Sequence, residues 1–323
     1  MSTKLLTSTD VRSSILSSEK GGLVIFEAIK NNIDPIIWTK ENRSLIDENL
    51  LKYGGVLLRN FKISTTSEFN QYAEVICTQL LDYTFASSPR TLLEGKVYTS
   101  TEFRADKEIP FHNEKSYSRD WPATILFFCV IPPEQGGETP VVDSRRVFNG
   151  LDKEIIDKFD RHGVLYVRRY NEQTDLSWQH VFQTDHPTEV EAFCREHDIE
   201  FAWQSSGSQL TTKQVCQATW THPITMEKVW FNQAHIFHLS VFEKEMQNEL
   251  LSKQGEHGLS RNAYYGDGSP IEEEALDHIR EVYRKEEILF KWQRGDILIL
   301  DNVLMAHGRK PYQGDRKIAV AMG

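Results

Sequence analysis

The stretch Trp292–His307, with the sequence WQRGDILILDNVLMAH, decides how this chain folds. Its apolar run Ile297–Leu300 has the length of a short buried strand, with Gly-Asp before it and Asp-Asn after it as turn signals. His307 comes shortly after that second turn. We therefore expect a buried strand, a turn, and then a histidine whose side chain points into the interior.

Other parts of the chain show the same strand pattern. Short apolar runs with Gly, Pro, Asn or Asp close by occur at residues 55–58, 125–130, 164–167 and 318–321. Amphipathic spacing predicts a helix that starts near Ser64 and surface helices at 242–251 and 272–283. The glycine fingerprint of dinucleotide-binding folds and the phosphate-loop signature are absent. These patterns predict a mainly β protein with helical additions, as a β-sandwich or jelly roll.

The domain organisation follows from what the sequence lacks. No internal repeat, low-complexity tract or Pro- or Ser-rich linker divides the 323 residues. We therefore expect a single domain over residues 1–323. Its N-terminal part, about 1–95, is expected to be helical, and a central insertion at about 145–285 to carry further helices.

Composition and charge narrow the class of partner. A formal net charge of −10, with no basic run longer than a pair, argues against nucleic acid. No apolar stretch has the length of a signal peptide or a membrane span, which predicts a cytoplasmic protein without membrane contact. The four cysteines are widely separated and are expected to be reduced and buried. The remaining classes of partner are a small molecule and a substrate carried by a protein.

The segment His112-Asn113-Glu114 is the first half of a candidate metal site. On an extended segment, residues two apart project from the same face, so His112 and Glu114 would lie together. With 11 His and 47 Asp and Glu in the chain, such a pair is expected about once or twice by chance. A second histidine from far along the chain, His307, would complete a site with two His and one carboxylate. Such a site leaves open coordination positions, as O2-activating Fe(II) requires.

Arg316 and Thr139 are candidates for holding an organic anion. Arg316 opens the final strand, and a guanidinium at the base of a pocket can grip the carboxylate of a dicarboxylic co-substrate by two hydrogen bonds. Thr139 follows a Gly-Gly turn that lets the backbone fold back toward the site. Taken separately, Arg316 is also compatible with a surface salt bridge, and Thr139 with an ordinary strand position.

Together these segments resemble the taurine dioxygenase family of Fe(II)/2-oxoglutarate oxygenases, from about residue 54 to 323. That family has a His-x-Asp/Glu pair, a Gly-Gly-Asp/Glu-Thr turn, a Trp-x-x-Gly-Asp strand entry and a distal His followed by Arg, in this order. In this chain they are residues 112–114, 136–139 and 292–296, then His307 with Arg316. Residues 111–117, 137–140 and 143–145 look most like the branch with the syringomycin-type aspartyl β-hydroxylases.

The resemblance implies a fold, a cofactor set and residue roles. The fold would be a double-stranded β-helix, or jelly roll. His112, Glu114 and His307 would bind Fe(II), and Thr139 and Arg316 would hold the C5 carboxylate of 2-oxoglutarate. With O2 as the oxidant, 2-oxoglutarate would become succinate while a substrate C–H bond is oxidised.

Three further residues are candidates for substrate contact. Thr101 and Glu102 lie shortly before the metal pair and could meet an amine or hydroxyl group, although loop residues of this kind are commonly only solvated. Asn232 could line the substrate pocket. The nearby His235 and His238 have no acidic partner in sequence and are expected to support the core rather than bind a second metal.

Two positions narrow the reaction. Halogenating relatives have a small residue where this chain has Glu114, so Glu114 favours hydroxylation, or the related desaturation or epoxidation. Relatives that use sulfonates typically carry a second Arg where this chain has Val320, which makes taurine an unfavoured substrate.

The resulting hypothesis is a hydroxylase that acts on an aliphatic C–H bond of an amino acid or an amino-acid-derived metabolite, free or bound to a carrier protein, in natural-product biosynthesis. A zinc hydrolase also uses two His and a Glu, but the His-Glu-x-x-His helix is absent and the Thr139 and Arg316 pair would have no purpose. A non-catalytic jelly-roll module that binds metabolites is the third alternative, and it predicts an incomplete set of metal ligands. Substrate identity, regiochemistry, stereochemistry and oligomeric state are not encoded in these motifs.

Overall fold

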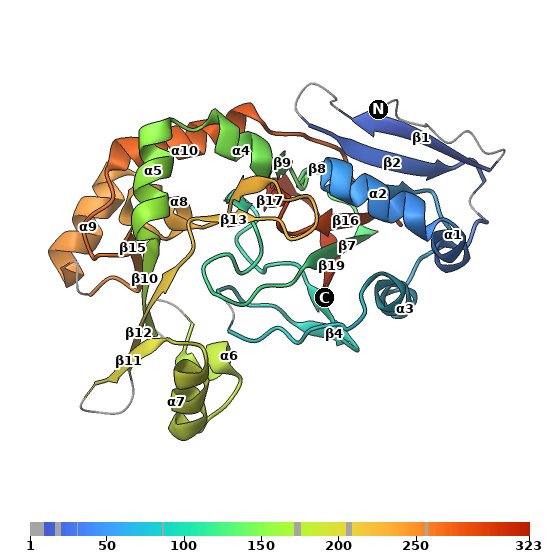
Figure 1. The fold of residues 1–323 in the computed structure, drawn as a ribbon. Helices are drawn as coiled ribbons and strands as arrows, with labels where there is room; N and C mark the ends of the chain where they lie inside the picture. Colours follow the sequence, from blue (N-terminus) through green and yellow to red (C-terminus); the bar gives the residue numbers. More distant parts are fainter. Residues whose placement is uncertain are drawn as a thin grey trace.

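The structure is a computed structural model that describes residues 10–16, 21–30, 32–85, 87–170, 176–204, 209–255 and 258–323. An eight-stranded sheet crosses the middle of the molecule (Figure 1). Its strands, in spatial order, are β1 (Val11–Leu16), β2 (Leu23–Ala28), β3 (Gly55–Arg59), β16 (Ile297–Asp301), β7 (Thr124–Ile131), β19 (Lys317–Met322), β5 (Val97–Thr99) and β4 (Leu92–Glu94). The strands expected at residues 55–58, 125–130, 297–300 and 318–321 are all in this sheet.

The centre of the large sheet is buried on both faces. Along β7, Ile125, Phe127 and Cys129 belong to one apolar cluster, whereas Leu126 and Phe128 belong to another on the opposite face. Successive side chains of a strand point to opposite faces, so a continuous apolar run suits a strand that is covered on both sides. This explains why the central strands are uninterrupted apolar runs in the sequence.

A second, smaller sheet covers one face of the large sheet. It consists of β6 (Ile109–His112), β17 (Met305–Arg309) and β9 (Val141–Asp143), beside the pair β18 (Tyr312–Gln313) and β8 (Gln135–Gly136). Val141 and Met305 from this sheet lie in the same apolar cluster as Phe127 and Leu298 from the large one. Two sheets packed face to face around a shared core form a β-sandwich, so the expected mainly β architecture is confirmed.

Three helices cover the other face of the large sheet. They are α1 (Pro35–Glu41), α2 (Arg43–Tyr53) and α3 (Thr66–Ile76). Helix α3 is the one expected near Ser64. Its N-cap is Thr65, which forms a reciprocal capping box with Glu68, and the helix ends at Ile76. Phe69, at its buried side, stacks on Phe128 of β7.

The N-terminal part, residues 1–95, differs from the expectation of a helical segment, because it also supplies β1 to β4. Strand β2 runs parallel to β3, whereas β1 is antiparallel to β2. A parallel neighbour requires a crossover connection, and α1 and α2 form that crossover. Helices α1 and α2 therefore connect two strands of the large sheet.

The central insertion also differs from the expectation, since it contains a sheet as well as helices. The sheet has the order β11 (Glu200–Trp203), β12 (Leu210–Cys216), β10 (Val164–Tyr170) and β15 (Arg261–Tyr265), and a separate hairpin pairs β13 (Thr219–Thr221) with β14 (Lys228–Trp230). Its helices are α4 (Ser144–Gly150), α5 (Lys153–His162), α6 (Trp178–Phe182), α7 (Pro187–Glu196), α8 (Ala234–Phe237), the 3-10 helix η2 (Leu239–Val241), α9 (Lys244–Gln254) and α10 (Glu273–Lys285). The surface helices expected at 242–251 and 272–283 are α9 and α10. The strand expected at residues 164–167 is part of β10.

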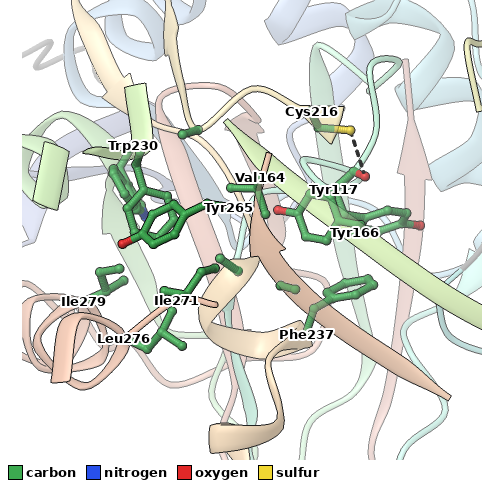
Figure 2. Close-up of a cluster of buried hydrophobic side chains, with 14 of the residues drawn as sticks. Tyr117, Val164, Tyr166, Cys216, Trp230, Phe237, Tyr265, Ile271, Leu276 and Ile279 are labelled. Atoms are coloured by element: carbon green, nitrogen blue, oxygen red, sulfur yellow. Dashed lines mark hydrogen bonds between the residues drawn. The ribbon is translucent and has the colours of Figure 1, made fainter. Parts of the chain in front are cut away.

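An aromatic core fixes this insertion to the rest of the chain. Figure 2 shows Trp230 and Tyr265 beside Leu276 and Ile279 of α10. Tyr117, which lies shortly after the candidate metal pair, packs edge-on against Tyr166 of β10 in the same core. The insertion is thus packed directly behind the segment that carries the candidate metal residues.

Two further expectations concern the cysteines and the membrane. Cys77, Cys129, Cys194 and Cys216 are all free and buried, as predicted. Among the described residues, no helix combines the length and apolar character needed to cross a membrane.

Candidate active site

Two neighbouring strands of the small sheet bring the candidate histidines together. His112 ends β6 and His307 is central in β17, and the two residues are direct cross-strand partners in antiparallel register. Their side chains therefore project from the same face, with ring centroids 4.4 Å apart. The ring of Phe127, from the large sheet, lies edge-on at 5.0 Å from His307 and closes one side.

Glu114 is positioned by a buried asparagine and not by a strand. The chain leaves β6 at His112, so the expected extended geometry does not continue through Glu114. Instead, the Asn302 Oδ1 accepts a hydrogen bond from the Glu114 backbone N–H at 2.7 Å, and the Asn302 Nδ2 donates to the Glu114 carbonyl at 3.0 Å. Asn302 belongs to the turn between β16 and β17. That turn therefore fixes Glu114 next to the strand that carries His307.

The three candidate ligands converge on one point. Ligand atoms of His112, Glu114 and His307 all lie within 4.8 Å of one another, and no other such cluster is present in the described part of the chain. Ligands about 2.1 Å from a shared ion are roughly 3–4 Å apart, so a small inward movement of the side chains brings all three onto one ion. Two imidazoles and a carboxylate with open positions form the donor set that suits non-haem Fe(II).

The protonation states also suit a metal. Burial lowers the pKa of His307 well below its usual value, and burial outweighs the Glu114 carboxylate in lowering the pKa of His112. Both imidazoles are therefore neutral at pH 7. Burial raises the pKa of Glu114, but Arg90 and His112 together outweigh it, so the pKa lies below its usual value and Glu114 is ionised.

The hydrogen bonds of the two imidazoles leave nitrogen lone pairs for a metal. The Nδ1 of His112 donates to the Pro110 carbonyl at 2.8 Å, which leaves the Nε2 lone pair free. The Nδ1 of His307 is buried and has no hydrogen-bond partner among the residues that the structure describes. A buried ring nitrogen without a partner is unfavourable unless it binds an ion. The residues present therefore fit a metal.

A small pocket opens beside His112 and His307. It is lined by both histidines together with Thr139 and Arg316, and its other lining residues are Arg90, Ser100, Thr101, Ile109, Phe127, Gly308 and Arg309. The pocket thus joins the metal ligands to the two residues expected to hold an anion.

Arg316 and Thr139 are in direct contact in this pocket. The Arg316 Nη2 donates to the Thr139 hydroxyl at 3.3 Å and the Nε donates to the Gly137 carbonyl at 2.9 Å. The indole N–H of Trp292 also donates to that hydroxyl, at 3.1 Å. Thr139 is therefore held from two sides, and the Trp292 of the strand-entry motif has a specific task.

Glycine is required at the turn that delivers Thr139. Gly136 and Gly137 both have φ of 68°, a backbone conformation that other residues rarely adopt. A Cβ on Gly136 would lie 2.1 Å from the Pro311 carbonyl oxygen, which is impossible without moving the backbone. The Gly-Gly pair therefore allows close contact with the segment that precedes Arg316.

Arg316 is a charged residue of this pocket. Among the described residues no carboxylate lies within ion-pair distance of it. Burial, with the nearby Arg309 guanidinium, lowers the pKa of Arg316 to about 10, so it remains charged at pH 7. A buried cation of this kind is stabilised by an incoming anion, and a guanidinium fits a carboxylate.

The predicted substrate residues have different positions. Thr101 lines the pocket and shares a hydrogen bond of 3.2 Å with Ser88. Glu102 does not line it, and its carboxylate accepts from the hydroxyls of Thr91 and Thr99.

Asn232 is buried away from the pocket lining, and both ends of its amide bond to backbone, at Ala218 and Ala234. His235 is buried, and its Nε2 donates to the Phe111 carbonyl, as expected for a histidine that supports the core.

The pocket also contains three polar residues that were not predicted from the sequence, Arg90, Ser100 and Arg309. The Ser100 hydroxyl lies 3.4 Å from the Arg316 Nη1. Arg309 lies two residues after His307, a spacing that would have placed both on one face of a strand. Nothing in the local sequence around Arg90 indicates its contact with Glu114.

Comparison with known proteins agrees with this geometry. The model of the family "Taurine catabolism dioxygenase TauD, TfdA family" matches residues 25–322. The chain belongs to this family of non-haem Fe(II)/2-oxoglutarate-dependent oxygenases. The dapdiamide synthesis protein DdaC of Enterobacter agglomerans is 40% identical over 277 residues, which cover 86% of this chain and 84% of that protein. A clavaminate synthase-like protein of Arabidopsis thaliana is 28% identical over 292 residues, or 88% of this chain and 85% of that protein.

Solved structures show the same fold. The PvcB protein from Pseudomonas aeruginosa superposes with a TM-score of 0.55 at 15% identity, over 100% of this chain and 94% of that one. A taurine dioxygenase from Burkholderia xenovorans gives 0.55 at 15% identity, over 97% and 89%. The expected jelly-roll core with helical additions is therefore confirmed.

Proposed function

We propose that His112, Glu114 and His307 bind Fe(II) and that Thr139 and Arg316 hold the C5 carboxylate of 2-oxoglutarate. The observation that carries this proposal is the shared pocket. His112 and His307, whose ligand atoms converge with that of Glu114, line it, and so does the partly buried guanidinium of Arg316, for which the described residues supply no acidic partner. An Fe(II)/2-oxoglutarate enzyme needs the metal ligands and the carboxylate-binding residue to be no further apart than the length of one 2-oxoglutarate molecule.

The residues of the site have separate tasks. When bound, the iron supplies O2 activation, with 2-oxoglutarate as the source of two electrons. Arg316 orients 2-oxoglutarate by its distal carboxylate, and the contacts of Arg316 with Gly137 and Thr139 fix its own direction. Phe127 and Ile109 line the same pocket with apolar surface and limit the access of water to it.

The reaction is the hydroxylation of an aliphatic C–H bond. Glu114 supplies a carboxylate at the ligand position that halogenating relatives leave free, and this supports transfer of oxygen. Desaturation or epoxidation would use the same residues and would differ only in the product.

The substrate is an amino acid or an amino-acid-derived metabolite of natural-product biosynthesis, free or attached to a carrier protein. The similarity to a protein named for dapdiamide synthesis supports this class. Taurine is disfavoured because Val320, where sulfonate-using relatives typically carry an arginine, is buried in the core between the sheets.

The proposal is tested by measuring succinate formation in air from 2-oxoglutarate, with Fe(II) and a panel of amino acids offered free and as carrier-protein thioesters. We expect stimulation of succinate formation by one group of related compounds and a product that has gained one oxygen atom. The variant His307→Ala removes a ligand and is expected to abolish succinate formation.

A matched control is His162→Gln, because His162 is a partly exposed histidine in the central insertion that pairs with Asp267. This variant should keep the activity of the parent. The proposed function would be contradicted if His307→Ala formed succinate as fast as the parent protein, or if succinate formation continued without O2.

A further inference from the structure

Arg90 is a buried cation that the functions assigned so far do not use. It lies just before β4, its side chain is 3% exposed, and it lines the pocket beside the candidate ligands. Its Nη2 donates to the Glu114 Oε2 at 2.7 Å, and its guanidinium stacks 4.3 Å from the centre of the Tyr83 ring. The guanidinium is therefore held rigidly, one carboxylate away from the metal position.

Two of the three nitrogens of this guanidinium are poorly satisfied. The Nε is buried and has no hydrogen-bond partner among the residues that the structure describes. The Nη1 has the thioether sulfur of Met322 as its contact, at 3.7 Å, and a thioether is a weak acceptor. A buried guanidinium with unused donors is costly unless a further acceptor approaches it.

Metal binding would leave the Arg90 guanidinium with even less compensation for its donors and its charge. Glu114 is the only acidic residue that the described part of the chain places within ion-pair distance of Arg90. Once Glu114 shares its charge with a divalent ion, Arg90 faces that ion across a single carboxylate, and like charges at such a distance repel in a buried site. An additional anion next to Arg90 removes this repulsion.

A count of charges in the pocket indicates how many anions it takes. Fe(II) brings two positive charges, Arg90 and Arg316 bring one each, and Glu114 removes one. The two carboxylates of 2-oxoglutarate remove two more, so one positive charge remains. Arg309 also lines the pocket and adds a further positive charge. Its Nη1 and Nη2 donate to the carbonyls of Phe103, Arg104 and Lys107, whereas its Nε has no hydrogen-bond partner among the described residues.

The two arginines line the same pocket but are held by different residues. Arg316 contacts Gly137, Thr139 and Ser100, whereas Arg90 contacts Glu114 and Met322, and no hydrogen-bond partner is common to both. We propose that Arg90 binds a carboxylate of the organic substrate and holds it next to the metal, so that the substrate is an anion. This inference rests on the proposed function and adds the charge of the substrate to it.

The inference also bears on the form in which the substrate arrives. An amino acid that is joined to a carrier through its only carboxyl group has lost the charge that Arg90 binds. A free acid, or a tethered residue that retains a second carboxylate, keeps it.

The test uses full-length protein loaded with Mn(II) and N-oxalylglycine, an analogue of 2-oxoglutarate that occupies the Arg316 position. Trifluoroacetate is the probe, and the paramagnetic relaxation of its fluorine nuclei by Mn(II) reports an anion held close to the metal. Neutral trifluoroethanol is the matched probe without charge. We expect strong relaxation of trifluoroacetate in the parent protein, at least tenfold weaker relaxation in Arg90→Gln, an intermediate value in Arg90→Lys, and weak relaxation of trifluoroethanol throughout.

Arg12→Gln is the control variant, since Arg12 is an exposed arginine of the edge strand β1 that pairs with Glu27 of β2. It should behave as the parent protein does. The Mn(II) affinity of each variant, measured by titration, separates loss of the carboxylate site from a disturbed metal site.

Two results would overturn the role of Arg90. The first is equal relaxation of trifluoroacetate in the parent and in an Arg90→Gln protein that binds Mn(II). The second is equal relaxation of trifluoroacetate and trifluoroethanol in the parent. Failure of the parent to bind Mn(II) and N-oxalylglycine would overturn the proposed function, and this inference with it.

Discussion

Replacement of Asn302 by alanine tests how Glu114 is positioned. The Asn302 side chain is fully buried and satisfies three backbone groups, the N–H and the carbonyl of Glu114 and the carbonyl of Pro122. In Asn302→Ala all three lose their partner. Each buried polar group left unpaired costs about 1–3 kcal/mol, so we expect the free energy of unfolding to fall by about 4 kcal/mol.

The same substitution is expected to weaken metal binding. Without Asn302 the backbone at Glu114 is no longer fixed beside β17, so part of the binding energy is spent on ordering it. We expect the Mn(II) affinity to fall at least tenfold, which corresponds to about 1.4 kcal/mol.

Urea unfolding of metal-free protein and Mn(II) titration measure the two effects. Asn49→Ala is the matched control, because Asn49 donates one hydrogen bond to the Leu45 carbonyl within a surface helix. It should lose less than about 1 kcal/mol. A loss of less than about 1 kcal/mol in Asn302→Ala, with unchanged Mn(II) affinity, would refute the reasoning about Glu114.

Three further predictions concern other parts of the site and the core. Arg316→Met removes charge-assisted hydrogen bonds worth about 3 kcal/mol, so the KM for 2-oxoglutarate in the succinate assay should rise roughly 100-fold with unchanged Mn(II) affinity, and an unchanged KM would contradict the assignment. Burial, with Arg280, lowers the pKa of His235 to about 3. Below about pH 6.5 this histidine is therefore protonated in the unfolded chain but not in the folded protein, so the free energy of unfolding falls as the pH decreases. Between pH 6.5 and 5, His235→Gln should lose about 1.5 kcal/mol less than the parent in urea unfolding, and parallel curves would refute this. Asp296→Ala leaves Arg59 without its carboxylate and should lower the free energy of unfolding by about 3 kcal/mol, whereas a loss below 1 kcal/mol would show that this buried pair is not needed.

The sequence predicts the centre of the fold well because the central strands are buried on both faces. The run at residues 297–300 has no polar interruption, and this pattern survives without tertiary information. Strand β1 was missed because its sequence, VRSSIL, has three consecutive polar residues and no alternation of polar and apolar residues, so it resembles a loop. In the sheet of the central insertion only the strand at residues 164–167 was predicted, because long connections and helices separate it from its partner strands.

The candidate metal ligands could be named from the sequence because metal binding restricts them to few residue types and the motifs occur in a fixed order. The mechanism of placement was not predictable, because Glu114 depends on Asn302, which is 188 residues away. Arg90 was missed for the same reason. Its contact with Glu114 arises only when the segment before β4 folds against the small sheet.

The central claim is that His112, Glu114 and His307 hold iron beside a 2-oxoglutarate site. The most direct measurement is anaerobic titration of the metal-free protein with Fe(II) and 2-oxoglutarate, followed by visible absorption. We predict a weak charge-transfer band that saturates at one equivalent of iron in the parent and is absent in His307→Ala. Well-folded parent protein that shows no band, or a band that His307→Ala retains in full, would contradict the claim.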